Sequence, residues 1–233
     1  SMKAQIVKTI YVEAAHRVND PDKADDYTGN SYRIDLFAEG EIDPEIGWVI
    51  DYADMKHFFE PVRKQLDHAC LNNIPGLEED ASPKAIELWI AEQLHPWPSW
   101  FSGVRVSIPQ PKGFAATYLP ADDILGLPVR LAFAFSAAQS LPQLPEGHPC
   151  RALHGHTYQV ELAPTNRPLM EQTALEIYER LNDTYLNRVP GLEQATAERI
   201  AAWIWQFLTA KDIKPALVAV QETPKNRCHY RGE

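Results

Sequence analysis

Cysteine is scarce in this chain. Only three cysteines occur among the 233 residues (Cys70, Cys150 and Cys228), and no two have the spacing of a Cys-x-x-Cys pair. This is not the pattern of a disulfide framework, and it favours a reducing compartment. A membrane-spanning helix needs about 18 apolar residues in a row, and neither such a run nor a signal-peptide pattern is present. We therefore expect a cytoplasmic protein with no membrane partner.

Basic residues are the minority among the charged ones. Lysine and arginine number 22 against 32 aspartates and glutamates, which gives a formal net charge of -10. A protein that binds nucleic acid or an anionic membrane needs a basic surface, so this balance argues against both partners. A local basic pocket for a phosphorylated small molecule remains compatible with it. Hydrophobic residues make up 45% of the chain, enough for one large core or two modest ones.

The sequence repeats itself. Four blocks recur in the same order in the two halves: 12–16 with 135–139, 29–36 with 155–162, 71–78 with 186–193, and 86–90 with 200–204. Such ordered self-similarity indicates a tandem duplication. We predict an N-terminal unit over residues 1–118 and a C-terminal unit over residues 128–233, connected by a Pro- and Gly-punctuated linker over residues 110–127.

Each half predicts the element order β-β-α-α-β. A two-residue alternation marks the strands, and apolar residues spaced three and four apart mark the helices. We expect strands over 6–14, 32–38, 104–108, 129–135, 158–162 and 217–222, and helices over 52–66, 84–94, 171–181 and 197–208. Asp51, Ser82 and Thr196 are suited to cap three of these helices. The expected fold class is α+β, with helices on one face of an antiparallel sheet.

The second half contains a pattern typical of metal or catalytic chemistry, Cys150 followed by His154-Gly155-His156. Side chains alternate in an extended segment, so His154 and His156 face the same way and can share one metal ion. Cys150 lies a short loop away and can reach the same pocket as a thiolate of lowered pKa. Two alternate histidines after a cysteine favour metal binding or catalysis over an ordinary polar strand.

The third metal ligand is an open question at this level. Zinc normally takes at least three protein ligands, and the chain offers Gln139, whose amide oxygen is a poor one. His148 could approach from the loop before Cys150, although a solvated loop histidine is the more ordinary role. A metal-free site is equally compatible with these residues.

Five motifs together resemble a known family. They are Ala14-Ala15-His16, the Cys150 to His156 segment, Gly47-x-Val49-Ile50-Asp51-Tyr52, Asp67-His68-x-x-Leu71-Asn72 and Glu222-Thr223. This set is similar to the 6-pyruvoyl-tetrahydropterin synthase / 6-carboxytetrahydropterin synthase family, and the resemblance covers nearly the whole chain, twice. It implies the tunnelling fold (T-fold), in which small units assemble side by side into a barrel with active sites between neighbouring units. It also implies 7,8-dihydroneopterin triphosphate as substrate and zinc as the usual metal.

The resemblance implies three histidine ligands for each zinc, and neither half has all three. The first half keeps His16 but has Thr28 and Asn30 at the other two positions. The second half keeps His154 and His156, with Gln139 as a doubtful third ligand. We therefore expect zinc in the second half only.

The other roles implied by the resemblance are also divided between the halves. The catalytic pair Asp67-His68 survives in the first half, where the ring-binding position is Ile108. The second half has Asn182-Asp183 instead of that pair but keeps the pterin-binding Glu222 and the catalytic Cys150. The losses are complementary, so we predict one composite site. Its residues are Cys150, Asp67 and His68 for catalysis, Glu222 for substrate, and His154 and His156 for metal.

The leading hypothesis is a carbon–oxygen lyase that acts on 7,8-dihydroneopterin triphosphate. It would form 6-carboxytetrahydropterin, which we favour, or 6-pyruvoyltetrahydropterin. One alternative is a non-catalytic pterin- or purine-binding protein that has lost its metal, which Gln139 favours. Another is a metal-free enzyme similar to dihydroneopterin aldolase. In each case the expected partners are a small-molecule pterin and further copies of this chain, two or three in all, because T-fold units expose sheet edges that need cover.

Overall fold

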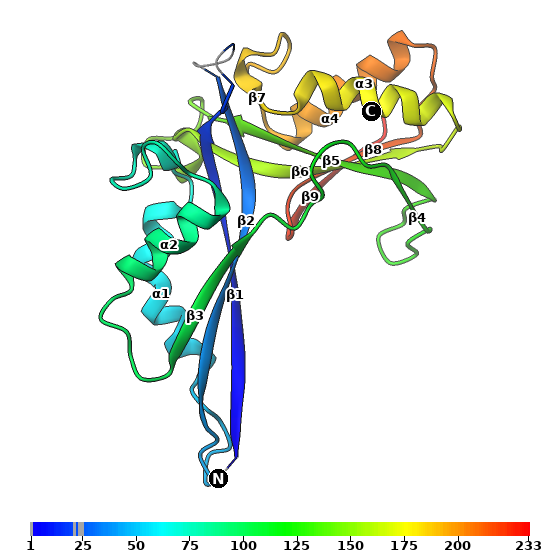
Figure 1. Cartoon of the computed structure of the whole chain (residues 1–233). Helices are drawn as coiled ribbons and strands as arrows, with labels where there is room; N and C mark the ends of the chain where they lie inside the picture. The colour runs from blue at the N-terminus through cyan, green and yellow to red at the C-terminus, as the bar shows by residue number, and fades with distance from the viewer. Residues whose placement is uncertain (1, 21, 23–25) are drawn as a thin grey trace.

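The computed structural model describes residues 2–20, 22 and 26–233 (Figure 1). In the first half, an antiparallel sheet has the order β1-β2-β3, from strands β1 (Lys3–Arg17), β2 (Tyr27–Glu41) and β3 (Phe101–Ser107). Helices α1 (Tyr52–Leu66) and α2 (Pro83–Gln93) lie together on one face of this sheet. A 3-10 turn, η2 (Leu71–Asn73), connects them.

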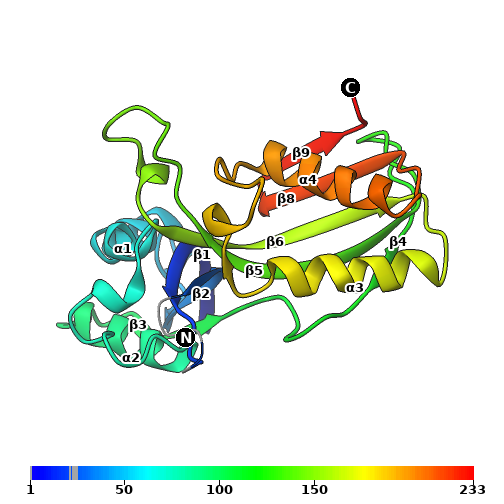
Figure 2. The same cartoon turned by 90° about the horizontal axis from the view of Figure 1, so that it is seen from above.

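The second half repeats this arrangement. Strands β5 (Arg130–Gln139), β6 (His154–Ala163), β8 (Leu217–Thr223) and β9 (Asn226–Tyr230) are antiparallel neighbours in that order. Helices α3 (Leu169–Leu181) and α4 (Ala197–Ala210) cover one face of the sheet (Figure 2). Two short turns, η3 (Pro149–Arg151) and η4 (Leu186–Arg188), and the two-residue strand β7 (Thr184–Tyr185) complete the half. The α+β class expected from the sequence is confirmed.

Local sequence signals account for the helix positions. The side chains of Asp51, Ser82 and Thr196 each accept a hydrogen bond from a backbone N–H in the first turn of α1, α2 and α4, as predicted. Each half also has its own core between sheet and helices, centred on Tyr32, Phe59 and Ile90 in the first and on Tyr158, Ile177 and Ile204 in the second. The repeat is therefore two separately packed units.

Several strands differ from the predictions. β1 and β2 each extend to 15 residues, well beyond the expected 6–14 and 32–38. Their ends pair as a hairpin although polar residues such as Lys3 and Glu41 face solvent there, so the apolar alternation that the prediction needs is missing. The prediction also omitted β9, and it omitted β4 (Thr117–Leu119), which lies where the expected first unit and linker overlap and pairs with β5 of the second half.

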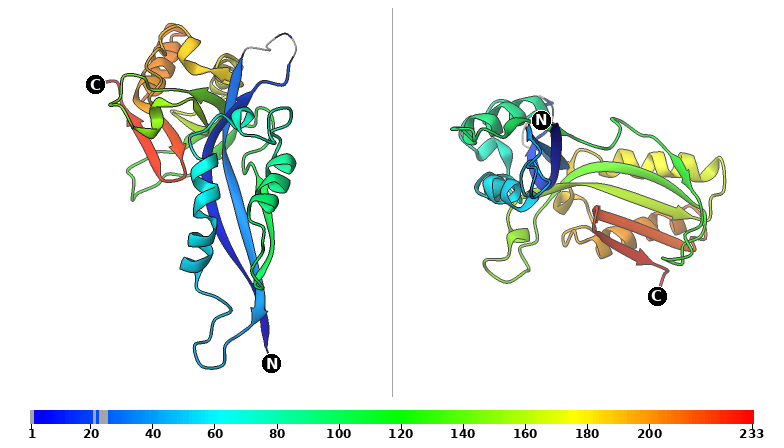
Figure 3. Two further views of the ribbon diagram at one scale, coloured as in Figure 1. Left: turned by 90° about the vertical axis from the view of Figure 1, so that its left-hand side faces the viewer. Right: turned by 90° about the horizontal axis from the view of Figure 1, so that it is seen from below.

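The two halves meet where their first hairpins cross (Figure 3). Gly29 on β2 and Gly155 on β6 face each other so closely that a Cβ added to either would lie 2.3 Å from the Cα of the other. On either side, the backbone N–H of Ser31 donates to Oγ1 of Thr157, and the N–H of Thr157 donates to Oγ of Ser31, both at 3.1 Å. These reciprocal contacts give the crossing an approximate two-fold symmetry.

Among the described residues, no helix is long and apolar enough to cross a membrane.

The crossing predicts a large effect of a single methyl group. In Gly155→Ala, the new Cβ would also lie 2.8 and 2.9 Å from the carbonyl oxygens of Ala14 and Ala137, so backbone must move. We expect the free energy of unfolding, measured in urea, to fall by more than about 3 kcal/mol. Gly40→Ala is the matched control, because its Cβ would meet only the flexible side chain of Val49, at 3.2 Å. Its cost should be about 1 kcal/mol or less, and an equal loss in both variants would contradict a tight crossing.

Candidate active site

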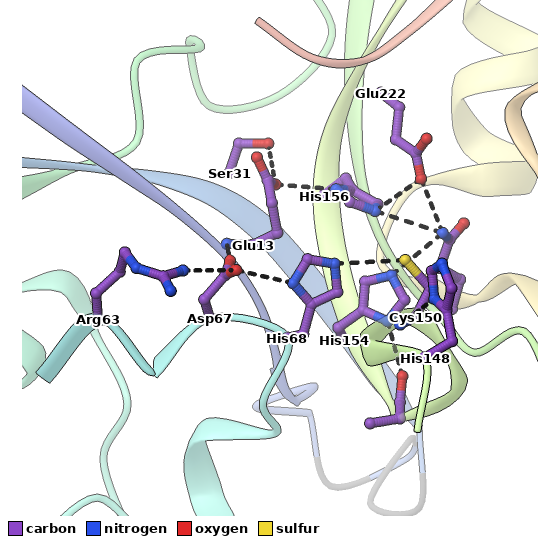
Figure 4. Close-up of polar contacts among 12 residues, drawn as sticks. Glu13, Ser31, Arg63, Asp67, His68, His148, Cys150, His154, His156 and Glu222 are labelled. Carbon is purple, nitrogen blue, oxygen red and sulfur yellow. Dashed lines mark hydrogen bonds and ion pairs between the residues drawn. The ribbon is translucent and has the colours of Figure 1, made fainter. Parts of the chain in front are cut away.

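The candidate site lies beside the crossing and takes residues from both halves (Figure 4). Asp67 and His68 directly follow the last residue of α1. Cys150 lies on η3, in the loop before β6. Strands β5, β6 and β8 supply the other predicted residues, Gln139, His154, His156 and Glu222. The structure thus brings together within one chain all the residues that the sequence assigned to a composite site.

Cys150, His68 and Asp67 form a chain of hydrogen bonds. Sγ of Cys150 lies 3.5 Å from Nε2 of His68, and Nδ1 of His68 lies 3.0 Å from Oδ2 of Asp67. A carboxylate at Nδ1 fixes the imidazole tautomer that leaves Nε2 unprotonated toward the thiol. The arrangement is that of a nucleophile or base, its proton acceptor and an orienting carboxylate.

The first half holds this pair firmly. Oδ1 of Asp67 accepts the backbone N–H of Glu13 at 2.9 Å, and Arg63 lies 3.3 Å from Oδ2. Burial works to raise the pKa of Asp67, but the bonds from His68 and from the Glu13 N–H outweigh it and lower that pKa. His68 has a left-handed backbone with φ of 58°, and Asp183, at the matching position of the second half, has φ of 55°. This conformation therefore belongs to the repeated fold and is not special to the catalytic pair.

His148 has a structural part in placing the thiol. Its Nδ1 accepts the backbone N–H of Cys150 at 3.1 Å and caps the turn η3. Among the described residues, His148 belongs to no group that could hold a metal ion, so the structure gives it a part in the loop and not in a ligand set.

The two site histidines differ in charge. Nδ1 of His154 is 2.7 Å from the carbonyl oxygen of Ala152, and burial, with the nearby His156, lowers the pKa of His154 to about 4. Burial also works to lower the pKa of His156, but the hydrogen bonds that it donates to Glu13 and Glu222, both at 2.9 Å, raise it to about 9. At neutral pH the metal-free site therefore holds a neutral His154 beside a protonated His156.

Gln139 presents its amide nitrogen, and not its oxygen, to this pair. Oε1 of Gln139 accepts the hydroxyl hydrogen of the fully buried Tyr158. Nε2 then faces the histidines, 3.3 Å from Nε2 of each, and donates to Glu222 at 3.0 Å. Because the protonated His156 has no lone pair to offer, the second amide hydrogen belongs to His154. In this orientation Gln139 donates hydrogen bonds and does not offer its oxygen to a metal. The group that can serve as third ligand beside the two imidazoles is the carboxylate of Glu222.

Among the residues that the structure describes, two overlapping groups could hold a metal ion. One is His154, His156 and Glu222, and the other is His68, Cys150 and His154; within each, the ligand atoms lie within 4.8 Å of one another. Both Nδ1 atoms of the pair His154 and His156 are already bonded, which leaves Nε2 as the metal-facing nitrogen, as in zinc sites. The donor set of two imidazoles with a carboxylate fits zinc.

The thiol of Cys150 differs from the expectation of a lowered pKa. Burial, with the negative charges of Glu222 and Asp67, raises the pKa of Cys150 above its ordinary value in the metal-free protein. At neutral pH Cys150 is therefore a thiol, and its proton has to pass to His68 before the sulfur can act as a base. The hydrogen bond between them supplies that route.

The corresponding positions of the first half form a hydrogen-bonded network. Thr28 donates to Oδ1 of Asp183 at 3.0 Å, and Oδ1 of Asn30 accepts from Ser136 at 2.6 Å. His16 contacts the carbonyl oxygen of Arg17 at 2.8 Å. In the part of the chain that the structure describes, none of these residues belongs to a group that could hold a metal.

Sequence reasoning missed two residues of the site, Glu13 and Tyr158. Glu13 bonds His156 across the halves, and Tyr158 fixes the amide of Gln139. The repeat held a signal for Glu13, because the matching position of the second half is Ser136, so this pair of positions has a carboxylate in the first half only.

The metal groups predict where zinc is taken up. We expect the double variant His154→Ala/His156→Ala to bind no zinc, since it loses both imidazoles of the donor set, while His16→Ala binds as much as the wild type. Metal content after purification without chelator, followed by titration with zinc, measures both. Zinc retained by the double variant would contradict the assignment to the second half.

The comparisons with known proteins agree with the duplicated organisation. The profile of a family described as 6-pyruvoyl tetrahydropterin synthase matches residues 5–106 and again residues 129–233. The chain is 32% identical over 93 residues to dihydroneopterin monophosphate aldolase of Pyrococcus furiosus, covering 40% of this chain and 76% of the relative. It is 34% identical over 116 residues to 6-carboxy-5,6,7,8-tetrahydropterin synthase of Synechocystis sp., covering 42% of this chain and 88% of the relative.

Solved structures of 6-pyruvoyl tetrahydropterin synthases are also similar to this chain. The 6-pyruvoyl tetrahydropterin synthase of Caenorhabditis elegans has a TM-score of 0.41 at 19% identity, covering 46% of this chain and 89% of its own. That of Plasmodium vivax has a TM-score of 0.26 at 12% identity, covering 99% of both chains. The profile matches, one in each half, account for nearly the whole sequence. This chain is a tandem-duplicated member of the 6-pyruvoyl tetrahydropterin synthase family, a pterin-processing family with the T-fold.

Proposed function

We propose that this protein is a carbon–oxygen lyase that acts on 7,8-dihydroneopterin triphosphate, at a site shared between its two halves. The observation that supports this most is the bonded series Cys150, His68 and Asp67, which joins a thiol from one half to a proton acceptor from the other. A family member that had lost catalysis would have no need to keep these three side chains in contact.

The proton transfers follow from the contacts. Asp67 holds the Nδ1–H of His68, so Nε2 accepts the proton of the Cys150 thiol. The thiolate then takes a proton from a hydroxyl-bearing carbon of the substrate side chain, and loss of triphosphate or cleavage of the side chain follows. His68, now protonated, can return its proton to the leaving group or to the product. Because burial and two carboxylates disfavour the thiolate, it exists only while His68 holds the proton.

Glu222 is the residue that would bind the pterin ring. Its side chain is 23% exposed, and the contacts that it makes to His156 and Gln139 both use Oε1. A pterin offers two adjacent N–H donors, which suit a carboxylate at the end of an apolar strand. The burial of β8 up to Val220 makes a partner for this charge necessary, and His156 is that partner in the free protein.

Zinc would be held by His154 and His156, with Glu222 as a further oxygen ligand in the absence of substrate. When bound, it would polarise the side-chain hydroxyl groups of the substrate and lower their pKa. The first half offers Thr28 and Asn30 at the matching positions, which are poorer zinc ligands than imidazole. We favour the 6-carboxytetrahydropterin product, in keeping with the relative that bears this name.

A second candidate is a metal-free aldolase that acts on a dihydroneopterin. The similarity to dihydroneopterin monophosphate aldolase supports it, and so does the amide nitrogen of Gln139 between the two histidines. Parallel assays separate the candidates: release of triphosphate from dihydroneopterin triphosphate that stops on adding chelator supports the lyase. Chelator-resistant cleavage of dihydroneopterin monophosphate supports the aldolase. Binding of both pterins without turnover would leave only a pterin-binding protein.

The shared site predicts the behaviour of mixed variants. Cys150→Ala and His68→Ala should each lower kcat by at least about 100-fold, while pterin affinity, which depends on Glu222, changes little. Since Cys150 and His68 meet within one chain, mixing the two variants after dissociation and reassembly should restore no activity. Recovery in the mixture would show that the working site lies between chains. Full activity of His68→Ala would reduce the first half to a scaffold.

We also propose that two or three chains assemble into a barrel. In the described residues the two sheets end on β1, β3, β4 and β9, and such edges are normally covered. Two chains would supply four units and three chains six. Analytical ultracentrifugation should show a single species of two or three chains, and a stable monomer would contradict the barrel.

A further inference from the structure

Glu13 makes hydrogen bonds both to the proton relay and to the imidazole pair. It lies on β1 of the first half, and only 6% of it is exposed. Its backbone N–H donates to Oδ1 of Asp67 at 2.9 Å, and its carbonyl oxygen accepts the N–H of His68 at 2.6 Å. Its side chain points the other way, across the crossing, to His156 of the second half (Figure 4).

One oxygen of the Glu13 carboxylate makes two hydrogen bonds in this position. Oε2 accepts from Nδ1 of His156 at 2.9 Å and from the hydroxyl of Ser31 at 2.5 Å. A carboxylate buried to this degree is costly without such partners. A carboxylate at Nδ1 orients an imidazole and keeps Nε2 pointed at whatever it binds. The direction of Nε2 of His156 is thus set from the first half of the chain.

The matching position on the other side of the crossing, Ser136, offers a comparison for the carboxylate of Glu13. The backbone contacts are the same there: Ser136 takes the place of Glu13, its N–H donates to Asn182 at 3.0 Å, and its carbonyl oxygen accepts from Asp183 at 2.7 Å. The side chains differ in concert, because Ser136 faces Asn30 where Glu13 faces His156. A glutamate therefore occurs where the opposite residue is a histidine, and a serine where it is an asparagine, within one fold.

We infer that Glu13 is the positioning residue of this site, which holds the Nδ1–H of His156, fixes the direction of its ring and ties it to the Asp67–His68 pair. The inference rests on the proposed function and adds one point to it: a residue of the first half, which lacks the metal ligands, sets the geometry of a metal ligand in the second half. It predicts that zinc binding needs the hydrogen bond between residue 13 and Nδ1 of His156, and not only a negative charge at residue 13. A glutamine at position 13 can still accept the Nδ1–H through its amide oxygen, whereas an alanine cannot.

The test uses the full-length protein with Glu13→Ala, Glu13→Gln and the matched control Ser136→Ala. Glu13→Ala should weaken zinc binding, measured by competition with a chromophoric chelator, by about 10- to 100-fold, with a similar fall in kcat. KM for the pterin should change little, because Glu222 is unaltered. Glu13→Gln should recover most of both quantities. Ser136→Ala, at the matching place of the other half, should leave zinc affinity and kcat unchanged.

A measurement without metal keeps the result independent of the proposed reaction. In chelator-treated protein labelled with nitrogen-15, the Nδ1–H of His156 should give a protected imidazole signal in the wild type and in Glu13→Gln, and lose it in Glu13→Ala. Retention of that signal in Glu13→Ala would overturn the inference, as would equal losses of zinc affinity in Glu13→Ala and Ser136→Ala. If the signal behaves as expected but the wild type turns over no pterin, only the proposed function fails.

Discussion

The contact of Gly29 with Gly155 is the constraint on which the rest of the site depends. No side chain larger than hydrogen fits between these two backbones, so the two hairpins cross at one fixed place. This crossing sets Ser31 against Thr157 and brings Glu13 opposite His156. It also places the end of α1 beside η3, so that His68 reaches Cys150. The contact between His68 and Cys150, 82 positions apart in sequence, thus follows from one backbone approach.

The buried charges depend on one another. His156 bears a positive charge in a buried place because Glu13 and Glu222 lie on its two sides. Glu222 is an anion for the same reason, since burial opposes its charge and the bond to His156 restores it. Removing His156 would leave both carboxylates without their cation, and removing either carboxylate would take one hydrogen-bond partner from His156. A metal ion or a pterin that enters has to exchange with this set of partners, so binding and protonation are coupled.

The repeat made much of the fold predictable, and complementary losses made the site predictable. Helix positions followed from apolar spacing and the caps Asp51, Ser82 and Thr196. Asp67 and His68 could be joined to Cys150 because each half lacks what the other keeps. The amide orientation of Gln139 could not be predicted, because it depends on a hydroxyl group of β6 that only packing places beside it. The raised pKa of Cys150 likewise arises from its burial and from the charges of Glu222 and Asp67, which come near it only in the folded chain.

Duplication within one chain explains how the two sites could become different. In an assembly of identical units, every change at one site occurs at all of them, so loss of a zinc ligand is general. Here Ser136 can bond Asn30 while Glu13 bonds His156, because the two positions are encoded separately. On the side with Asn30 and Asp183, hydrogen bonds hold the halves together. The two histidines and Glu13 are confined to the other side of the crossing, where His156 and Glu13 form their own contact between the halves.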